Sequence, residues 1–263
     1  MRLQSVSLSS TFLILGSLSL PAQQASNDGL KLPSRESALV GPATARPNLS
    51  LEQRGDIFMA RKMYREAVEA YQQGPGNSAI LANKIGIAYH QLTFLPQARK
   101  QYERAQRIDA RYSEAINNLG TVYYAQKSYR KAISQYRKAL KLNPASASIH
   151  SNLGTAYFAR KKYADAFDEY QTALSLDPEV FEHRNSHGVL LQERSVEERA
   201  KFHFYLAKTY AKSGQTDRAL LYIRKAIEEG FKERNKFAED SDFVTMRQLP
   251  EFMELMKLET RAL

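Results

Sequence analysis

The sequence has 263 residues but contains no cysteine and no tryptophan. Without cysteine it has no disulfide, no thiolate ligand for a metal ion and no thiol that could carry a lipid at an export cleavage site. It also lacks a Walker-type phosphate loop, a Gly-x-Ser-x-Gly motif, an HExxH zinc motif and a GxGxxG loop between strand and helix. We therefore expect a protein that is not an enzyme and that needs no cofactor.

Two kinds of ionisable pair remain as candidates for chemistry. His183 and His187 are spaced i, i+4, which could place them on one face of a helix as metal ligands. No carboxylate with motif spacing accompanies them, and a glycine follows directly. The pairs Glu197/Glu198 and Glu228/Glu229 lie in segments that resemble surface helices. We predict neither a metal site nor an acid–base pair.

The chain is basic, with a formal net charge of +10. Its residues are 43% hydrophobic and 25% charged, which is enough apolar content for a folded core and shows no bias toward disorder. A positive net charge permits contact with nucleic acid, an anionic membrane or acidic proteins, and it selects none of them.

The first 25 residues have the order of a secretory signal peptide. One arginine gives a positive start, and residues 6–20 then form an uncharged, mostly apolar run. At 1.5 Å per residue this run reaches about 22 Å, short of the roughly 30 Å of a bilayer core. We predict cleavage between Ser19 and Ala25, export to the periplasm or the extracellular space, and no transmembrane segment afterwards. An uncleaved interfacial anchor is the alternative.

A repeat of 34 residues is the strongest pattern in the sequence. A glycine, two tyrosines and two alanines recur in step at this spacing. They are Gly86, Gly120 and Gly154; Tyr89, Tyr123 and Tyr157; Ala98, Ala132 and Ala166; Tyr102, Tyr136 and Tyr170; and Ala105, Ala139 and Ala173. Pro144 and Pro178 close two of the units. The period and the residue set resemble the tetratricopeptide repeat (TPR) over residues 48–233.

The resemblance implies an all-α fold, a TPR-type right-handed α-solenoid of about five helix pairs. Glycine at position 8 and alanine at position 20 of each unit let its two helices cross closely. Aromatic rings at positions 11 and 24 are expected to fill the space on either side, and alanine at position 27 admits the next unit. A single pair cannot bury its apolar face, so the units stack.

The predicted boundaries divide the chain into four parts. They are a signal peptide (1–25), a disordered linker (26–47), a TPR array (48–233) with units 48–77, 79–112, 113–146, 147–180 and 200–233, and a C-terminal helical cap (234–263). The insert 181–199 precedes the fifth unit, because Ala207 follows Gly154 by 53 residues. Ser195 to Glu198 resemble a capping box, and Pro250 suits the first turn of the last helix.

In TPR proteins the first helix of each unit lines a concave groove, which positions 2, 5, 6, 9, 12 and 13 face. We take positions 5, 6 and 12 as the candidate binding positions. Besides Ser151, the residues at these positions are Asn83, Lys84, His90, Asn117, Asn118, Tyr124, Asn152 and Phe158. An asparagine amide offers both donors and an acceptor, which suits an extended peptide backbone. The resemblance therefore implies a scaffold or adaptor that binds a protein or peptide partner of unknown identity in this groove.

Two other interpretations of the groove residues stay open. The amides of Asn118 and Asn152 can bond a neighbouring helix instead of a peptide. Lys84 and Asn118 are also fragments of the carboxylate-clamp set that binds acidic C-terminal tails, although the sequence otherwise departs from that set.

The strongest local charge lies in residues 113–146, where one acid, Glu114, faces six basic residues. These are Lys127, Arg130, Lys131, Arg137, Lys138 and Lys141. Most take outward positions on the second helix, so they form either a solvated convex face or a contact for anionic envelope polymers or lipid surfaces. We exclude nucleic acid as a partner, because the protein is expected to be exported and lacks an aromatic-plus-basic recognition motif.

Overall fold

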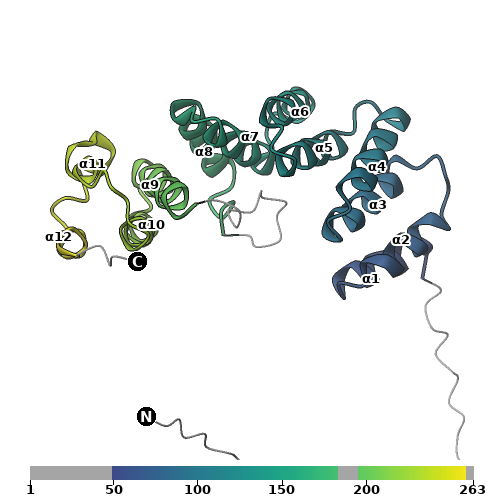
Figure 1. Cartoon of the computed structure of the whole chain (residues 1–263), viewed down its shortest axis with the longest axis horizontal. Helices are drawn as coiled ribbons and strands as arrows, with labels where there is room; N and C mark the ends of the chain where they lie inside the picture. Colours follow the sequence, from purple (N-terminus) through teal and green to yellow (C-terminus); the bar gives the residue numbers. More distant parts are fainter. Residues whose placement is uncertain (1–48, 183–194, 259–263) are drawn as a thin grey trace, which may run out of the picture. The chain divides into compact units, whose positions relative to one another are not determined.

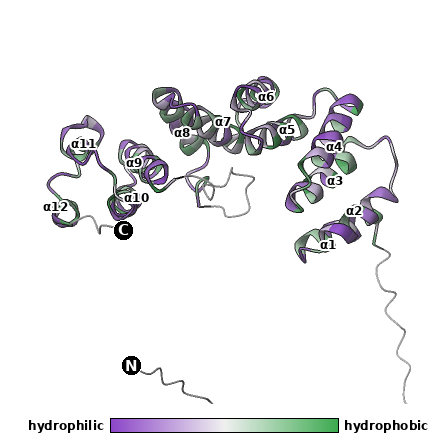
Figure 2. Ribbon diagram, viewed as in Figure 1, coloured by the Kyte–Doolittle hydropathy of each residue, from purple (hydrophilic) through white to green (hydrophobic). Residues whose placement is uncertain are grey.

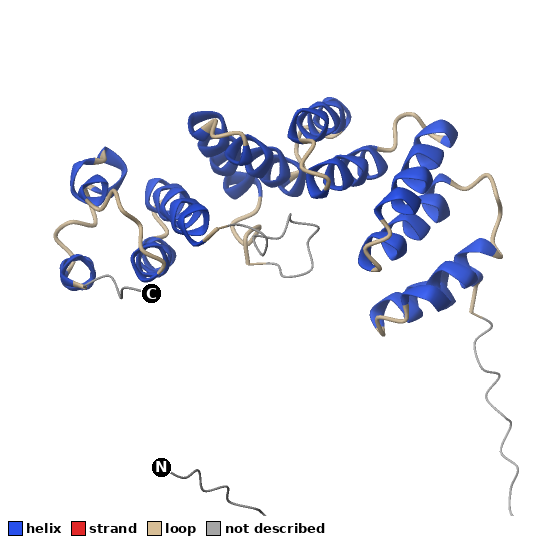
Figure 3. Cartoon of the chain, viewed as in Figure 1, coloured by secondary structure: helices blue, strands red, loops and turns tan. Residues whose placement is uncertain are grey.

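The computed structural model describes residues 49–182 and 195–258. Every regular element in these ranges is a helix, and they contain no strand (Figure 3). The predicted signal peptide, the linker and the pair His183/His187 lie outside the described residues.

Ten of the helices form five consecutive pairs (Figure 1). The pairs are α1 (Leu51–Ala60) with α2 (Tyr64–Gln72), α3 (Ala79–Gln91) with α4 (Leu95–Ile108), α5 (Ser113–Ala125) with α6 (Tyr129–Leu142), α7 (Ala147–Ala159) with α8 (Tyr163–Leu176), and α9 (Val196–Lys212) with α10 (Thr216–Glu228). Most helices carry hydrophilic residues on one side and hydrophobic residues on the other (Figure 2). The partners of each pair pack on one another, so the predicted all-α solenoid of helix pairs is confirmed.

A short turn joins the two helices of each unit. In the first four units the turn places a residue with a side chain in the left-handed region, with φ between 57° and 62°. These residues are Lys62, Thr93, Lys127 and Lys161. In the fifth unit the same place holds Gly214, with φ 75°. Glycine adopts this conformation without the steric cost that a Cβ adds.

The glycine at position 8 explains how closely the two helices of a unit approach. An added Cβ on Gly120 would lie 2.5 Å from Cε1 of Tyr136, and one on Gly154 would lie 2.6 Å from Cε1 of Tyr170. Gly55 and Gly86 face the tyrosine of their own unit in the same way. The ring occupies the place of the missing side chain, so a glycine–tyrosine pair holds the two helices together in each of the first four units.

The fifth unit replaces both members of this pair. Ala207 stands at the glycine position and Ile223 at the tyrosine position, and both side chains are fully buried. A small increase in volume on one helix is thus matched by a decrease on the other, as close packing of a core requires.

The aromatic rings predicted to fill the space beside the helix crossing pack against the core at both positions and are more deeply buried at position 24 than at position 11. At position 24 all four tyrosines are at most 2% exposed. At position 11 only Tyr157 and Tyr210 are buried, whereas Phe58, Tyr89 and Tyr123 are half-buried. The rings of position 11 lie at the margin of the helix crossing, and in Tyr123 the ring is covered by the ammonium of Lys131 at 5.7 Å.

Small residues at position 27 let consecutive units touch. Ala105, Ala139, Ala173 and Ala226 are fully buried there. The degenerate first unit has Gly74 instead, and an added Cβ would lie 2.5 Å from a methyl group of Leu81 in α3. Gly74 therefore lets the first unit pack against α3 of the second, and it also lies at the end of the shortened first unit.

The fifth unit packs on the fourth although the insert separates them in sequence. Phe181 lies edge-on between Tyr170 and Tyr210, with ring centroids 5.5 and 6.1 Å apart. The carboxylate of Glu182 accepts a hydrogen bond from Tyr210 at 3.3 Å. Ser195 accepts from the backbone of Glu198 and caps α9, which begins four residues before the predicted unit boundary.

The C-terminal segment covers the last helix pair. It consists of α11 (Asn235–Glu239), the 3₁₀ helix η2 (Ser241–Phe243) and α12 (Pro250–Lys257), with proline in the first turn of α12 as expected. Its buried residues are Phe231, Phe237, Phe243, Met246, Phe252 and Leu255. Phe231 stacks on Phe204 of α9 with ring centroids 4.6 Å apart, so the segment shares one core with the fifth unit.

Candidate functional site: the face of the first helices and a basic hollow

The first helices of neighbouring units contact one another, α3 with α5 and α5 with α7. Equivalent positions on these helices therefore come together, as the 34-residue spacing predicts. The asparagines at positions 5 and 6 form a single chain of hydrogen bonds across the three helices.

In this chain each side-chain amide donates to the next residue. Asn152 donates to Asn117 at 3.1 Å, and Asn117 donates to Asn118 at 3.3 Å. Asn118 donates to Asn83 at 3.0 Å, and Asn83 donates to the hydroxyl of Tyr112 at 3.4 Å. All bonds run in one direction, an arrangement in which successive bonds polarise each other.

The asparagine chain is buried. Asn118 is 5% exposed and Asn152 is 1% exposed. The sequence left two roles open for the amides of Asn118 and Asn152, hydrogen bonding to a peptide or to a neighbouring helix. In the structure they bond a neighbouring helix. Contact between these amides and a peptide remains a prediction. The carbonyl oxygen of Asn152, at the end of the chain, is buried and has no hydrogen-bond partner among the described residues.

The three residues at position 12 lie in different surroundings. His90 is half-buried, whereas Tyr124 and Phe158 are buried. Phe158 packs edge-on against Phe202 of α9, with ring centroids 5.4 Å apart. Of the position 12 residues predicted to face the groove, Phe158 thus helps to join the fourth unit to the fifth.

Lys84 is engaged in ion pairs within the array. Its ammonium lies 2.7 Å from Glu52 and 2.7 Å from Asp56, both on α1. Burial acts to raise the pKa of Asp56, but hydrogen bonds from Lys84 and Tyr71 outweigh it and hold that pKa below its usual value. The lysine therefore ties the second unit to the first, a role that its sequence position did not reveal.

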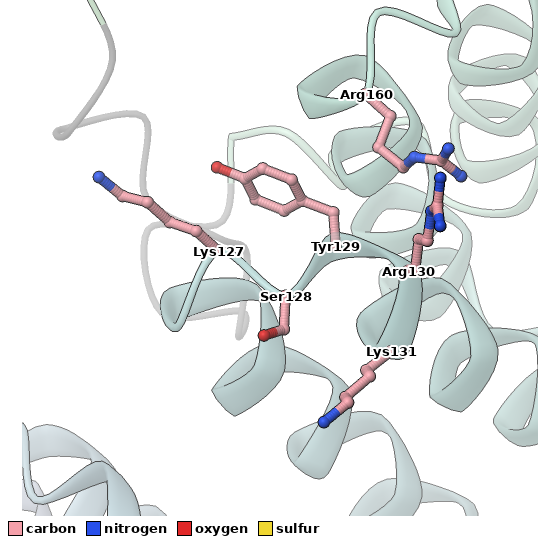
Figure 4. Close-up of a pocket in the computed structure, with 6 residues that line it drawn as sticks. All are labelled: Lys127, Ser128, Tyr129, Arg130, Lys131 and Arg160. Carbon is pink, nitrogen blue, oxygen red and sulfur yellow. The ribbon is translucent and has the colours of Figure 1, made fainter.

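The predicted basic residues of α6 are all exposed, and four cations surround an open hollow beside them. The hollow has a volume of about 390 Å³, and Figure 4 shows the side chains that line it. They are Lys127, Ser128, Tyr129, Arg130, Lys131 and Arg160. The charge of residues 113–146 pointed to three of the four cations, but Arg160 belongs to the next unit and joins them only through the fold.

Within residues 49–182 and 195–258, no three histidine, aspartate or glutamate side chains gather where they could hold a metal ion. None of the helices in these ranges combines the length and apolar character needed to cross a bilayer.

Comparisons with known proteins agree with the repeat pattern. One family model, described as TPR repeat, matches residues 120–159, and two described as tetratricopeptide repeat match residues 147–180 and 200–229. No curated protein matches the chain.

Two solved structures illustrate the similarity of fold. The crystal structure of MamA has 20% identity and a TM-score of 0.46, and the match covers 70% of this chain and 96% of that one. The first TPR of Spaghetti (RPAP3), bound to an HSP90 peptide, has 21% identity and a TM-score of 0.41, with 42% of this chain and 90% of that one covered.

Proposed function

Because the chain is a tetratricopeptide-repeat protein, we propose that it is an exported, non-catalytic scaffold that holds a polypeptide segment along the face of its first helices. The observation that carries this proposal is the direct contact of α3 with α5 and of α5 with α7. Three helices then present one continuous face, long enough for several residues of an extended partner.

The geometry changes which residues we assign to the partner. The asparagines of positions 5 and 6 are bonded to one another, so their first role is to hold the face in register. Contacts to a partner fall to side chains of the same helices that reach solvent. Ile80 and Glu114, both at position 2, are exposed, and His90 is half-buried.

Site-specific photo-cross-linking in the native source tests the proposal. A photoreactive residue at Ile80 or Glu114 should form an adduct with another polypeptide. The same residue at Lys100 in α4 or Lys141 in α6, both exposed on second helices, should not. Adducts from the second-helix positions alone would assign binding to the other face and refute the groove proposal.

Export is tested separately on the same material. We expect the mature N-terminus to lie between Ser19 and Ala25 and the protein to be found outside the cytoplasm. A soluble cytoplasmic protein that begins at Met1 would remove export from the proposal and leave the scaffold role intact.

A further inference from the structure

The hollow beside α6 brings together cations from two successive units. Lys127 lies in the turn before α6, Arg130 and Lys131 lie in the first turn of α6, and Arg160 ends α7. The guanidinium groups of Arg130 and Arg160 extend toward one another, whereas Lys127 and Lys131 reach outward on either side (Figure 4).

These four cations are not paired with an acid in the part of the chain that the structure describes. The corresponding regions of later units are balanced. Lys162 lies 3.2 Å from Asp165, and Arg218 pairs with Glu179. Two guanidinium groups that face each other without an anion repel, so this arrangement is stabilised when an anion lies between them.

The backbone that carries the two arginines is held in place. Tyr129, next to Arg130, packs on Tyr124 with ring centroids 5.1 Å apart. The backbone N–H of Arg160 donates to the carbonyl of Tyr157 at 3.0 Å. The positions from which the guanidinium groups extend are therefore fixed before a ligand arrives, which lowers the entropic cost of binding.

We propose that this hollow binds carboxylates of an acidic segment in the polypeptide partner, an inference that rests on the proposed scaffold function. The planar fork of arginine matches a carboxylate with two parallel hydrogen bonds, and two such forks meet here. Lys127 and Lys131 attract further acidic residues of the same segment. The partner thus extends from the face of the first helices across the turns at the edge of the array.

The surface favours an acidic polypeptide over an anionic membrane. Proteins that bind membranes at the interface insert apolar side chains beside their basic residues. No large aliphatic or phenylalanine side chain lines this hollow, and the exposed large hydrophobic residue of α6 is Leu142, at the opposite end of the helix. A concave opening also suits a side chain better than a planar lipid surface.

Binding of a short oligoglutamate peptide to the purified full-length protein tests the proposal, with an oligoglutamine peptide of equal length as the ligand control. The double variant Arg130→Gln/Arg160→Gln should bind oligoglutamate about tenfold more weakly, equivalent to ~1.4 kcal/mol. The matched variant Lys138→Gln/Lys141→Gln removes the same charge from the exposed side of α6 and should bind within about twofold of wild type, because distant exposed charges are screened.

A third variant separates geometry from charge. Arg130→Lys/Arg160→Lys keeps both charges but loses the planar forks, so it should also bind the acidic peptide more weakly than wild type. All three variants alter side chains that reach solvent, and thermal unfolding should confirm that they remain folded.

Two outcomes would overturn the inference. Equal losses in the arginine-to-glutamine and lysine-to-glutamine variants would show a diffuse charge effect without a site. Arginine-dependent sedimentation with phosphatidylglycerol vesicles, without binding of oligoglutamate, would assign the hollow to lipid. Either outcome is distinguishable from failure of the scaffold proposal, which the cross-links at Ile80 and Glu114 report independently.

Discussion

The junctions between units are built in two different ways. Where the second, third and fourth units meet, buried amides link the first helices, as in the bond from Asn118 to Asn83. Where the fourth and fifth units meet, aromatic rings take that role. Phe158 packs against Phe202, and Tyr163 stacks on Tyr205 with ring centroids 5.2 Å apart.

This difference follows from the regularity of the chain. A hydrogen bond needs a distance and an angle within narrow limits, which a strict 34-residue spacing reproduces from unit to unit. The insert before the fifth unit removes that constraint. Burial of apolar surface is non-directional, so aromatic rings can join two units whose spacing is irregular. The fifth unit accordingly has Phe204 at position 5 and Tyr205 at position 6. In the second to fourth units position 5 is asparagine or serine, and position 6 is lysine or asparagine.

The largest expected effect concerns the aromatic end of the array. A chain that ends at Glu229 loses the six buried residues of the C-terminal segment and exposes Phe204, whose ring stacks on Phe231. Because terminal repeats need a polar outer face, we expect aggregation, measured by size-exclusion chromatography with light scattering. A chain that ends at Leu258 is the control. A monomeric truncated protein with an unchanged melting temperature would show that residues 230–258 are an appendage.

The third unit packs Gly120 against Tyr136, whereas the fifth unit has Ala207 and Ile223 at the same positions. Substitution of the fifth unit's residues into the third unit tests whether the two pairs are equivalent. Gly120→Ala alone should cost about 1–3 kcal/mol, since its Cβ would overlap the ring of Tyr136. Combined with Tyr136→Ile, it reproduces the pair Ala207/Ile223. The double variant should be less destabilised than the sum of the single variants, measured by urea unfolding. Additive losses would contradict direct packing between the two positions.

The amide junction is tested by Asn152→Ala. This change leaves the buried carbonyl oxygen of Asn117 without its donor and should cost about 1–3 kcal/mol. From the sequence alone, replacement of Asn118 and Asn152 should leave the melting temperature almost unchanged. The bonds across α3, α5 and α7 lead us to expect a lower melting temperature instead. Gln97→Ala removes an exposed amide from α4 and should have little effect. Equal melting temperatures for both variants would argue against a structural role for the chain of amides.

The stability of the fifth unit, which follows the insert, should also depend on pH. Burial lowers the pKa of His203, although Glu229 acts in the opposite direction. The ordinary pKa of a histidine is about 6.5. When the pH falls below this value, His203 takes up a proton more readily in the unfolded chain than in the folded one, so the free energy of unfolding decreases. Thermal unfolding at neutral and mildly acidic pH should show this loss in wild type and a smaller loss in His203→Gln. An equal loss in both proteins would contradict a role for His203 in the pH dependence.

The smallest expected effect distinguishes two equivalent tyrosines. The hydroxyl of Tyr136 is buried and bonds none of the described residues, whereas that of Tyr170 donates to Thr155 at 3.3 Å. Tyr136→Phe should stabilise the fold by up to ~1 kcal/mol, since burying an unpaired hydroxyl is unfavourable. Tyr170→Phe should destabilise it by about 0.5–1.5 kcal/mol. Matching melting temperatures in the two variants would contradict this difference.

The sequence predicted what the spacing controls. Helix pairs, the close approach of the two helices at Gly120 and the capped start of α9 at Ser195 all follow from local pattern and period. It could not predict which polar atoms meet, because that depends on the angle between stacked units. Asn118 had two feasible partners, a peptide and a helix, and only the packing of α3 on α5 supplied the second.

The basic hollow illustrates the same limit. The excess of charge in residues 113–146 identified the cations of α6, but no pattern connected them with Arg160, which lies 30 residues after Arg130. Similarly, Tyr123 and Tyr157 occupy the same repeat position, yet one is half-buried and the other is buried. Their exposure depends on neighbours from other units, which differ although the repeat does not.

The left-handed turns have a consequence for how this protein balances stability against recognition. Lys62, Thr93, Lys127 and Lys161 each hold a conformation that costs a residue with a Cβ roughly 1–2 kcal/mol, and Gly214 avoids that cost. Glycine at all of these turns would give a more stable array. It would also remove three positive charges, including the one that Lys127 contributes to the hollow. At Lys127, stability would therefore be gained at the expense of the proposed binding, so the two properties compete at that residue.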